Sequence, residues 1–438
     1  TRRSSDLLHE LPDQLAIMRG LTKWADRINA PAEAPGLVNE AFRRLISGRQ
    51  RPVALECAID TWGRKAPVVL PDTAAQRDPC PVDDDALERA AKLLGSADRP
   101  MIVIGGGAMD AGEHVKAIAE MLDAPVMVGR MGQGVLDGRH RLSVTMPAGY
   151  RFWGEADVVL AVGTRLQAAL QNWGVDDGLK IIRIDIDGEE IERQRKPEIG
   201  IVGDAAACLK VLAGKLGAHN KKRKGRAEAV AETKAAATKR IRDTIGPQIA
   251  YLEAIRAALP EDGILVDELT QMGYAARLAY PTYKPRTFLS MGYQGTLGWG
   301  YATSLGVKVA KPDTPVVSIS GDGGFLFTAM EMSTAAKNGI GVVAVVFSDG
   351  AYGNVRRIQQ QSFKGRTIAS DLHNPDFVKL GESFGVASER VSGPQELGAA
   401  ISRGIAKGGP VLIDCPVGEL PDPWPLVQVP RIRPPRKS

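Results

Sequence analysis

The sequence is poor in the features that mark secreted, zinc-binding or membrane proteins. Its four cysteines are scattered along 438 residues and form no CxxC pair, which argues against disulfides and against a structural zinc site. No apolar run approaches the ~20 residues of a membrane-spanning helix, and no secretory signal is visible. We therefore expect a soluble, cytoplasmic protein that does not engage membranes.

A large excess of charge of one sign is also absent. The net charge is only +5, and much of it lies in a basic run at 221–226 and in the tail at 431–437. Because no aromatic residue interleaves the first run, a solvated linker explains it better than a nucleic-acid surface. The composition, 44% hydrophobic and 24% charged, is that of a globular protein. Its length predicts two to three domains, and its small net charge predicts no nucleic-acid partner.

The most informative segment is 316–353, VVSISGDGGFLFTAMEMSTAAKNGIGVVAVVFSDGAYG. It predicts, in order, a strand at 316–320, the turn GDGG at 321–324, a helix at 325–337, a strand at 342–347 and a second acidic turn. In such a βαβ unit the two strands are parallel, so both turns emerge at the same edge of one sheet. Asp322 and Asp349 are therefore expected to lie side by side.

This arrangement predicts a particular chemistry. Two carboxylates that share an edge with exposed backbone carbonyls suit the octahedral coordination of Mg²⁺. The glycines of the first turn would expose amide groups at a helix N-terminus, where a phosphate is favoured. The segment thus predicts a magnesium–diphosphate site. The alternative, a βαβ turn with two ordinary surface aspartates and no nucleotide, stays open at this point.

This segment resembles the cofactor motif of thiamine-diphosphate-dependent enzymes, in which GDG is followed, after an intervening helix, by an Asn-Asn pair. Here GDGG is followed by a predicted helix and then by FSDGAYG. Ser348 and Asp349 stand in place of the asparagine pair. The resemblance implies that Asp322 and Asp349 give side-chain oxygens to Mg²⁺ and Ala351 its backbone carbonyl. Ser348 leaves one supporting hydrogen bond in doubt. By the same resemblance, three further residues would contact the cofactor: Gly323, Gly324 and Tyr352.

Two further segments extend the resemblance. Thr270 and Gln271 follow the apolar run 264–267, where relatives place polar groups on the diphosphate; a helix cap is the alternative. Gly295 opens the turn GTLGWG, in which Leu297 holds the position of the apolar wedge that bends the cofactor and so serves catalysis. A core leucine is the alternative for Leu297.

The whole chain resembles acetolactate-synthase-like enzymes, which implies an α/β fold with three domains, parallel sheets flanked by helices and an incomplete first domain. The expected divisions are the C-terminal part of a pyrimidine-binding domain with a linker (1–80), a central α/β domain (82–217), a charged helical linker (218–245), a diphosphate-binding domain (246–417) and an extended Pro-rich tail (418–438). In this family the cofactor lies between subunits, which implies a homodimer or homotetramer.

The central domain has a Gly-rich turn at 105–112 that follows a strand and precedes a helix, but its spacing is not GxGxxG. In relatives this domain binds FAD, an adenine nucleotide or nothing. Gly163-Thr164-Arg165 and the strand end at 183–187 match that domain, although simple strand termination explains them equally well. A bound nucleotide therefore stays open.

The first 80 residues carry one candidate, His9, which by resemblance faces the active site as a substrate contact or proton relay. The glutamate that activates the cofactor would lie upstream of Thr1, so we expect these 438 residues to bind cofactor but not to catalyse. Glu10 follows a different segment and is no substitute.

The resemblance implies thiamine-diphosphate and Mg²⁺-dependent cleavage or formation of a C–C bond, on a 2-oxo acid or a 2-hydroxyacyl compound. Carboligation or decarboxylation of a 2-oxo acid is the leading hypothesis. The alternatives are a 2-hydroxyacyl-CoA lyase and a catalytically silent nucleotide-binding or regulatory subunit.

Overall fold

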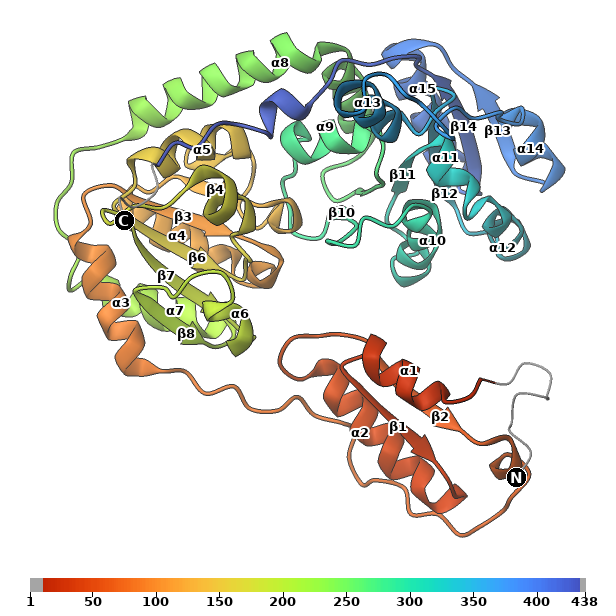
Figure 1. The fold of residues 1–438 in the computed structure, drawn as a ribbon, viewed down its shortest axis with the longest axis horizontal. Coiled ribbons are helices and arrows are strands. Elements are labelled where there is room, and N and C mark those ends of the chain that lie inside the picture. Colours follow the sequence, from red (N-terminus) through yellow and green to blue (C-terminus); the bar gives the residue numbers. More distant parts are fainter. Residues whose placement is uncertain (1–10, 434–438) are drawn as a thin grey trace. The chain divides into compact units, whose positions relative to one another are not determined.

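The computed structural model describes residues 11–433, and the chain divides into two compact units. The first, here the N-terminal unit, consists mainly of residues up to Asp83, and the second, the main unit, of nearly all residues from Asp84 onward (Figure 1). Within the described residues, no helix combines the length and the apolar character needed to cross a membrane.

The N-terminal unit is a two-stranded parallel sheet with helices. Its elements are α1 (Gln14–Leu21), β1 (Trp24–Ile28), α2 (Ala34–Ile46) and β2 (Val53–Cys57). The strands pair in register from Trp24 opposite Val53 to Ile28 opposite Cys57. The apolar pattern of the sequence predicts a helix at 34–46 and a strand at 52–58, and α2 and β2 lie there. The short α1 and β1 were not predicted, because polar residues interrupt their apolar positions.

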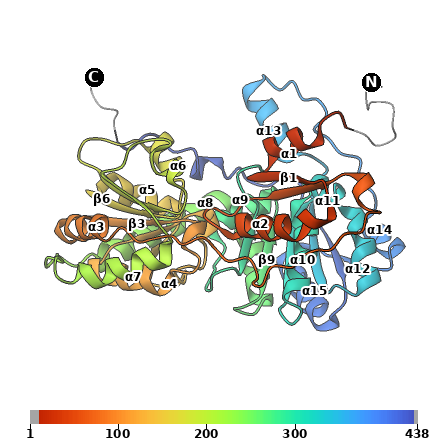
Figure 2. The ribbon, with the colours of Figure 1, turned by 90° about the horizontal axis from the view of Figure 1, so that it is seen from below.

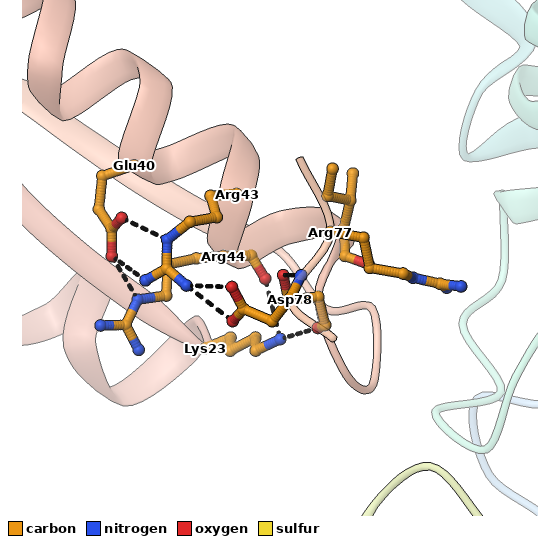
Figure 3. Close-up of polar contacts among 8 residues, drawn as sticks. Lys23, Glu40, Arg43, Arg44, Arg77 and Asp78 are labelled. Carbon is orange, nitrogen blue, oxygen red and sulfur yellow. Dashed lines mark hydrogen bonds and ion pairs between the residues drawn. The ribbon is translucent and has the colours of Figure 1, made fainter. Parts of the chain in front are cut away.

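A lysine closes the C-terminal end of α2 (Figure 3). Lys23 Nζ donates to the carbonyl oxygens of Arg44, Ser47 and Arg49 at 2.9, 2.5 and 3.1 Å. These carbonyls have no partner within the helix, and a cation is favoured at this end of the helix dipole. Beside them Arg43 pairs with Glu40 at 2.6 Å and with Asp78 at 2.5 Å. The contacts fix the start of β1 against the end of α2.

The main unit contains two six-stranded parallel sheets. The central sheet has the order β5-β4-β3-β6-β7-β8. Its strands are β3 (Pro100–Ile104), β4 (Val126–Val128), β5 (Ser143–Val144), β6 (Val158–Val162), β7 (Lys180–Asp185) and β8 (Ile199–Val202). Its helices are α3 (Asp84–Ser96), α4 (Gly112–Leu122), α5 (Met146–Glu155), α6 (Gly188–Glu192) and α7 (Ala205–Leu216). Helices α4 and α7 lie on the side of the sheet opposite α5 (Figure 2).

The C-terminal sheet has the order β10-β9-β11-β12-β14-β13. Its strands are β9 (Ile264–Asp267), β10 (Phe288–Ser290), β11 (Val316–Gly321), β12 (Val342–Ser348), β13 (Ala387–Arg390) and β14 (Val411–Pro416). The apolar runs of the sequence also predict central strands at 101–104, 124–128, 156–163, 180–187 and 199–204 and a last strand at 410–415, and the structure confirms these and the strands at 264–267, 316–320 and 342–347 within two residues. The short strands β5, β10 and β13 were missed because two to four residues carry too little pattern.

Each face of the C-terminal sheet has its own hydrophobic core. One core joins the strands to α8 (Ala227–Ala258), α9 (Gln271–Ala279) and α15 (Gly393–Lys407). The other joins them to α10 (Trp299–Ala310), α11 (Asp322–Leu326), α12 (Met332–Asn338) and α14 (Phe377–Ser383). Burial on both faces explains the continuous apolar runs of these strands. The α/β class with parallel sheets flanked by helices is confirmed.

Two expected helices differ from the prediction. The helix expected at 325–337 begins earlier, at Asp322, and is interrupted before a 3₁₀ turn and α12. At the interruption the Thr328 hydroxyl donates to the carbonyl oxygen of Gly298 at 3.0 Å, a partner from a distant turn. The helix expected in the charged linker starts only at Ala227, and α8 continues through a kink at Ile245, two residues before Pro247, to Ala258.

The C-terminal tail returns to the central sheet. After the 3₁₀ turn Trp424–Leu426, the amides of Ile432 and Arg433 both donate to the carbonyl oxygen of Trp173 at 3.0 Å. The Arg433 side chain donates to the carbonyls of Trp153, at 2.8 Å, and Ala156. It also pairs with Asp176 at 2.6 Å. Only 5% of Arg433 is exposed, so the tail is held by a buried cation.

We expect Arg433→Ala to lower the free energy of unfolding by about 1–3 kcal/mol, because it leaves buried acceptors without a donor. The measurement is a thermal unfolding scan of the variant beside Arg403→Ala. Arg403 is an exposed arginine that pairs with Glu389 at 2.6 Å, and its loss should change little. Equal midpoints for the two variants would show that the tail is not anchored by Arg433.

Candidate functional site

The candidate site lies at the carboxyl edge of the C-terminal sheet. Strands β11 and β12 are parallel neighbours, with Gly321 opposite Phe347, so the turns that follow them are adjacent. The first turn opens α11 with Asp322, of which only 1% is exposed. The predicted juxtaposition of the two acidic turns is therefore present in the structure.

Asp322 ties these turns together. Its Oδ1 accepts the amide of Gly323 at 2.8 Å, and its Oδ2 accepts the amide of Gly350 at 2.7 Å. The Asn374 side chain also donates to Oδ2 at 2.7 Å. Three donors to one buried carboxylate hold it in a single orientation with part of its acceptor capacity left over.

The pKa of Asp349 reflects a nearby negative charge. Burial, and next the charge of Asp322, raise the pKa of Asp349 to about 6. Its Oδ1 accepts the Ala351 amide at 3.1 Å. Two carboxylates that disfavour each other's charge are the arrangement that a divalent cation would stabilise. The Oδ1 of Asn374, buried and without a partner among the described residues, adds one more oxygen.

The protein side chains alone do not complete a metal site. Among residues 11–433, no group of three or more His, Cys, Asp or Glu gathers as it would around an ion. Two carboxylates would leave the remaining positions to a backbone carbonyl and to oxygens of a bound group, which is how Mg²⁺ is commonly held with phosphates. The donor set fits a metal that arrives with a diphosphate.

The glycines of the first turn are required by close neighbours. A Cβ at Gly323 would lie 2.5 Å from the ring of Tyr352, and one at Gly324 would lie 2.4 Å from Oε1 of Glu268. Tyr352, predicted to contact the cofactor, therefore packs on the turn itself. Any larger residue at either position would have to push these side chains aside.

Ser348 turns away from the site. Its hydroxyl donates to Oδ1 of Asp414, within β14, at 2.8 Å. Asp414 in turn accepts from Arg390 at 2.8 Å. The serine that replaces the first asparagine of the motif thus joins two strands, and Asp349 is left as the polar group of this turn that faces Asp322.

Thr270 and Gln271 approach the same edge from β9. A Cβ at Gly353 would lie 3.0 Å from both Gln271 Nε2 and Asp349 Oδ2, so these two side chains lie near the same point. Thr270 Oγ1 would be 3.3 Å from a Cβ at Gly321. Thr270 occupies the N-cap position of α9, but its side chain makes no capping hydrogen bond. That geometry favours the predicted role in binding over the helix-cap alternative.

Glu268 was missed by the sequence analysis. It is fully buried, its Oε1 accepts the Gly298 amide at 2.5 Å, and its Oε2 accepts the Gly300 amide at 3.2 Å and the Ser320 hydroxyl at 2.9 Å. Burial raises its pKa, while these donors act in the opposite direction. A charged residue directly after a buried strand was the available signal.

Leu297 lies in the turn that Glu268 holds. Gly295 and Gly298 on either side of it have φ of +62° and +83°, which favour glycine. Leu297 is half-buried and belongs to neither core of the C-terminal sheet as the structure describes them. This position agrees better with a wedge against a ligand than with a core leucine. His9 lies outside the described residues.

The Gly-rich turn of the central sheet has a packing role. A Cβ at Gly105 would lie 2.5 Å from the carbonyl oxygen of Gly163. A Cβ at Gly107 would lie 2.7 Å from the Cα of Gly163. Arg183 donates to the carbonyls of Ile191 and Thr164 at 3.2 and 3.0 Å. The glycines and this arginine are therefore accounted for without a nucleotide.

Comparison with known proteins agrees with this geometry. Residues 269–415 match the C-terminal TPP-binding domain of thiamine pyrophosphate enzymes, and residues 87–212 match their central domain. A probable 2-ketoarginine decarboxylase of Pseudomonas aeruginosa is 32% identical over 93% of this chain and 74% of its own length. This chain belongs to the thiamine pyrophosphate enzyme family.

Other relatives of this thiamine pyrophosphate enzyme differ in their named activities. A probable acetolactate synthase large subunit of Methanocaldococcus jannaschii is 31% identical over 94% of the chain and 74% of that protein. A 2-hydroxyacyl-CoA lyase of Arabidopsis thaliana is 30% identical over 92% of the chain and 75% of that protein. The predicted family, with its acetolactate-synthase-like character, is confirmed, and thiamine pyrophosphate (thiamine diphosphate) is its cofactor.

Proposed function

We propose that this thiamine pyrophosphate enzyme uses Mg²⁺ to hold the diphosphate and acts on a 2-oxo acid by decarboxylation or carboligation. The observation that supports it best is the convergence of Asp322, Asp349 and Gln271 at the ends of β9, β11 and β12. Asp322, Asp349 and the Ala351 carbonyl would hold the metal. Gly323, Gly324, Thr270 and Gln271 would contact the diphosphate, with Gly295 and Tyr352 beside the cofactor.

When bound, the cofactor supplies an electron sink for cleavage next to a carbonyl. The protein's part is to orient it and to exclude water. Leu297 is proposed as the side chain that sets the cofactor's bent shape, and Glu268 as the residue that positions the turn carrying Leu297. His9 stays a prediction as a substrate contact or proton relay.

The test is turnover with two 2-oxo acids, pyruvate and 2-ketoarginine, in the presence of thiamine diphosphate and Mg²⁺. Release of CO₂, or of a condensed hydroxy-keto acid, supports the proposal and separates decarboxylation from carboligation. Because residues 1–438 alone are expected to bind cofactor without turnover, the silent-subunit alternative is favoured only if a protein with a complete pyrimidine-binding domain also binds cofactor and turns over neither acid. Cleavage of a 2-hydroxyacyl-CoA instead would favour the lyase.

One observation weighs against the lyase alternative. In that alternative the basic tail and the central domain would hold the nucleotide of CoA, but Arg433 of the tail is buried and engaged with Trp153, Ala156 and Asp176. Since packing explains the glycines of the central turn, we do not extend the proposal to FAD or an adenine nucleotide.

We also propose that the enzyme is a homodimer or homotetramer. Large apolar side chains of the N-terminal unit are exposed, among them Leu21 (71%) and Phe42 (58%), as expected of a surface that another chain covers. Sedimentation of the cofactor-loaded protein should give a dimer or tetramer, and a monomer at micromolar concentration would contradict this.

We expect Leu297→Ala to lower kcat more than cofactor affinity, because the diphosphate and metal contacts remain while ring orientation is lost. The measurement is kcat together with the dissociation constant of thiamine diphosphate. Leu289→Ala, in strand β10 and packed against a core, is the control for a loss of apolar packing alone. If folded Leu297→Ala keeps full turnover, the side chain is no wedge.

A further inference from the structure

A cavity lies in the main unit at the opposite end of β9 from the cofactor residues. Its volume is about 380 Å³, and it is bounded by the last turn of α8, the segment that leads into β9 and the segment after α9. Its lining includes Arg256, Ala257, Leu259, Pro281 and Tyr283. The volume is within the range of small-molecule sites.

Arg256 lines this cavity with an unmatched charge. Only 8% of the residue is exposed, and its Nη2 donates to the carbonyls of Leu259, at 2.8 Å, and Pro260. Nη1 is buried and has no hydrogen-bond partner, and no carboxylate lies within ion-pair distance, among the residues that the structure describes. A buried guanidinium without a counter-ion is unfavourable, so the cavity favours an anion.

The side chains that line the cavity indicate what the uncharged part of such an anion would be. The rings of Tyr280 and Tyr283 each lie 5.4 Å from the Arg256 guanidinium carbon, and Arg139 covers the Tyr283 ring at 4.1 Å. The hydroxyl of Tyr280 is buried and also lacks a partner among the described residues. Tyr280 lies behind the lining, whereas the Tyr283 ring, Leu259 and Pro281 form apolar and aromatic walls that suit a compact apolar or planar group.

Two glutamates in the lining limit its charge. Glu253 pairs with Arg242, and Glu261 with Arg139 at 2.5 Å. Their charges are compensated, yet their carboxylates would repel an anion of charge two or more. Arg256 is thus the one lining cation not matched by a carboxylate in this part of the described chain, which favours a single negative charge.

We propose that this cavity binds a small monocarboxylate with an apolar or aromatic body, its carboxylate on Arg256 and its body against Tyr283 and Leu259. The site is separate from the cofactor residues, and its two bounding segments continue into β9 and α9, which carry Glu268, Thr270 and Gln271 at their other ends.

The experiment is calorimetric titration of the whole protein with benzoate. Arg256→Met removes the cation, and Ala257→Phe fills the cavity from an exposed position while leaving the guanidinium in place. Each should weaken benzoate binding at least about tenfold, the scale of one charge-assisted hydrogen bond. Arg403→Met, an exposed arginine elsewhere, should bind as the parent does.

Two further titrations separate this site from others. Asp322→Ala should keep benzoate affinity, since the cofactor site is elsewhere, and inorganic phosphate should bind more weakly than benzoate. No detectable benzoate binding to the parent protein would overturn the proposal. So would unchanged affinity in folded Ala257→Phe, or loss of binding in Asp322→Ala, which would place benzoate at the cofactor site.

Discussion

Asp322→Ala is expected to abolish cofactor binding. The substitution removes one metal oxygen and also the acceptor shared by the amides of Gly323 and Gly350 and the side chain of Asn374. The two turns would then lose the carboxylate that hydrogen-bonds to both of them. Because supporting contacts alone change metal affinity by about 10–100-fold, loss of a ligand should weaken thiamine diphosphate binding on the order of 100-fold or more.

The measurement is titration of thiamine diphosphate with Mg²⁺ held in excess. Asp371→Ala is the matched control: the Asp371 backbone forms a bridge with Ala351 that the substitution keeps, its side chain is 76% exposed, and among residues 11–433 its ion pair is with Arg356 at 3.1 Å. It should bind cofactor as the parent does. Unchanged affinity in Asp322→Ala would show that the metal is held elsewhere.

Glu268→Ala is expected to destabilise the main unit and to lower turnover. It leaves the amides of Gly298 and Gly300 and the Ser320 hydroxyl without their buried acceptor. At about 1–3 kcal/mol for an unsatisfied buried group, the free energy of unfolding should fall by roughly 3 kcal/mol. The turn with Leu297 would also lose its anchor, so kcat should fall in protein that remains folded.

Glu268→Gln tests that explanation. The amide oxygen can still accept from Gly298, and the amide nitrogen can donate to the Ser320 hydroxyl, but the acceptor for Gly300 is lost. Its stability and kcat should therefore lie between those of the parent and the alanine variant. Glu389→Ala, which removes a half-buried glutamate that pairs with Arg403 at 2.6 Å, is the control for loss of charge. Equal effects of Gln and Ala would mean that the charge, and not the hydrogen bonds, matters.

The parts of the site that depend on local sequence pattern could be predicted from the sequence. GDGG after an apolar run is enough to predict a turn at a strand end, and the parallel crossover then brings Asp322 to Asp349. The buried strands of the C-terminal sheet are continuous apolar runs, so their positions follow from composition. Leu297 was identifiable because it lies between glycines that the turn requires.

Other features depend on partners distant in the chain. Thr328 interrupts a helix of ordinary composition because its hydroxyl reaches Gly298, 30 residues away. Glu268 could be seen as a charge after a strand, but its role comes from amides 30 and 32 residues further on. Ser348 stands in place of an asparagine of the cofactor motif, and its hydroxyl donates to Asp414, 66 residues later. No local pattern encodes such pairings.

The course of the tail has a consequence for biosynthesis. The ribosome makes Arg433 after every strand of both six-stranded sheets, yet its guanidinium occupies carbonyls at the end of α5 in the first of them. Until Arg433 is made, the carbonyl oxygens of Trp153 and Ala156 have only water as a donor in place of its guanidinium. This lasts while some 270 further residues are translated, roughly 15–60 s at ordinary elongation rates. Nascent chains released before residue 433 would leave these carbonyl oxygens without the arginine, a difference that chaperones and proteases could recognise.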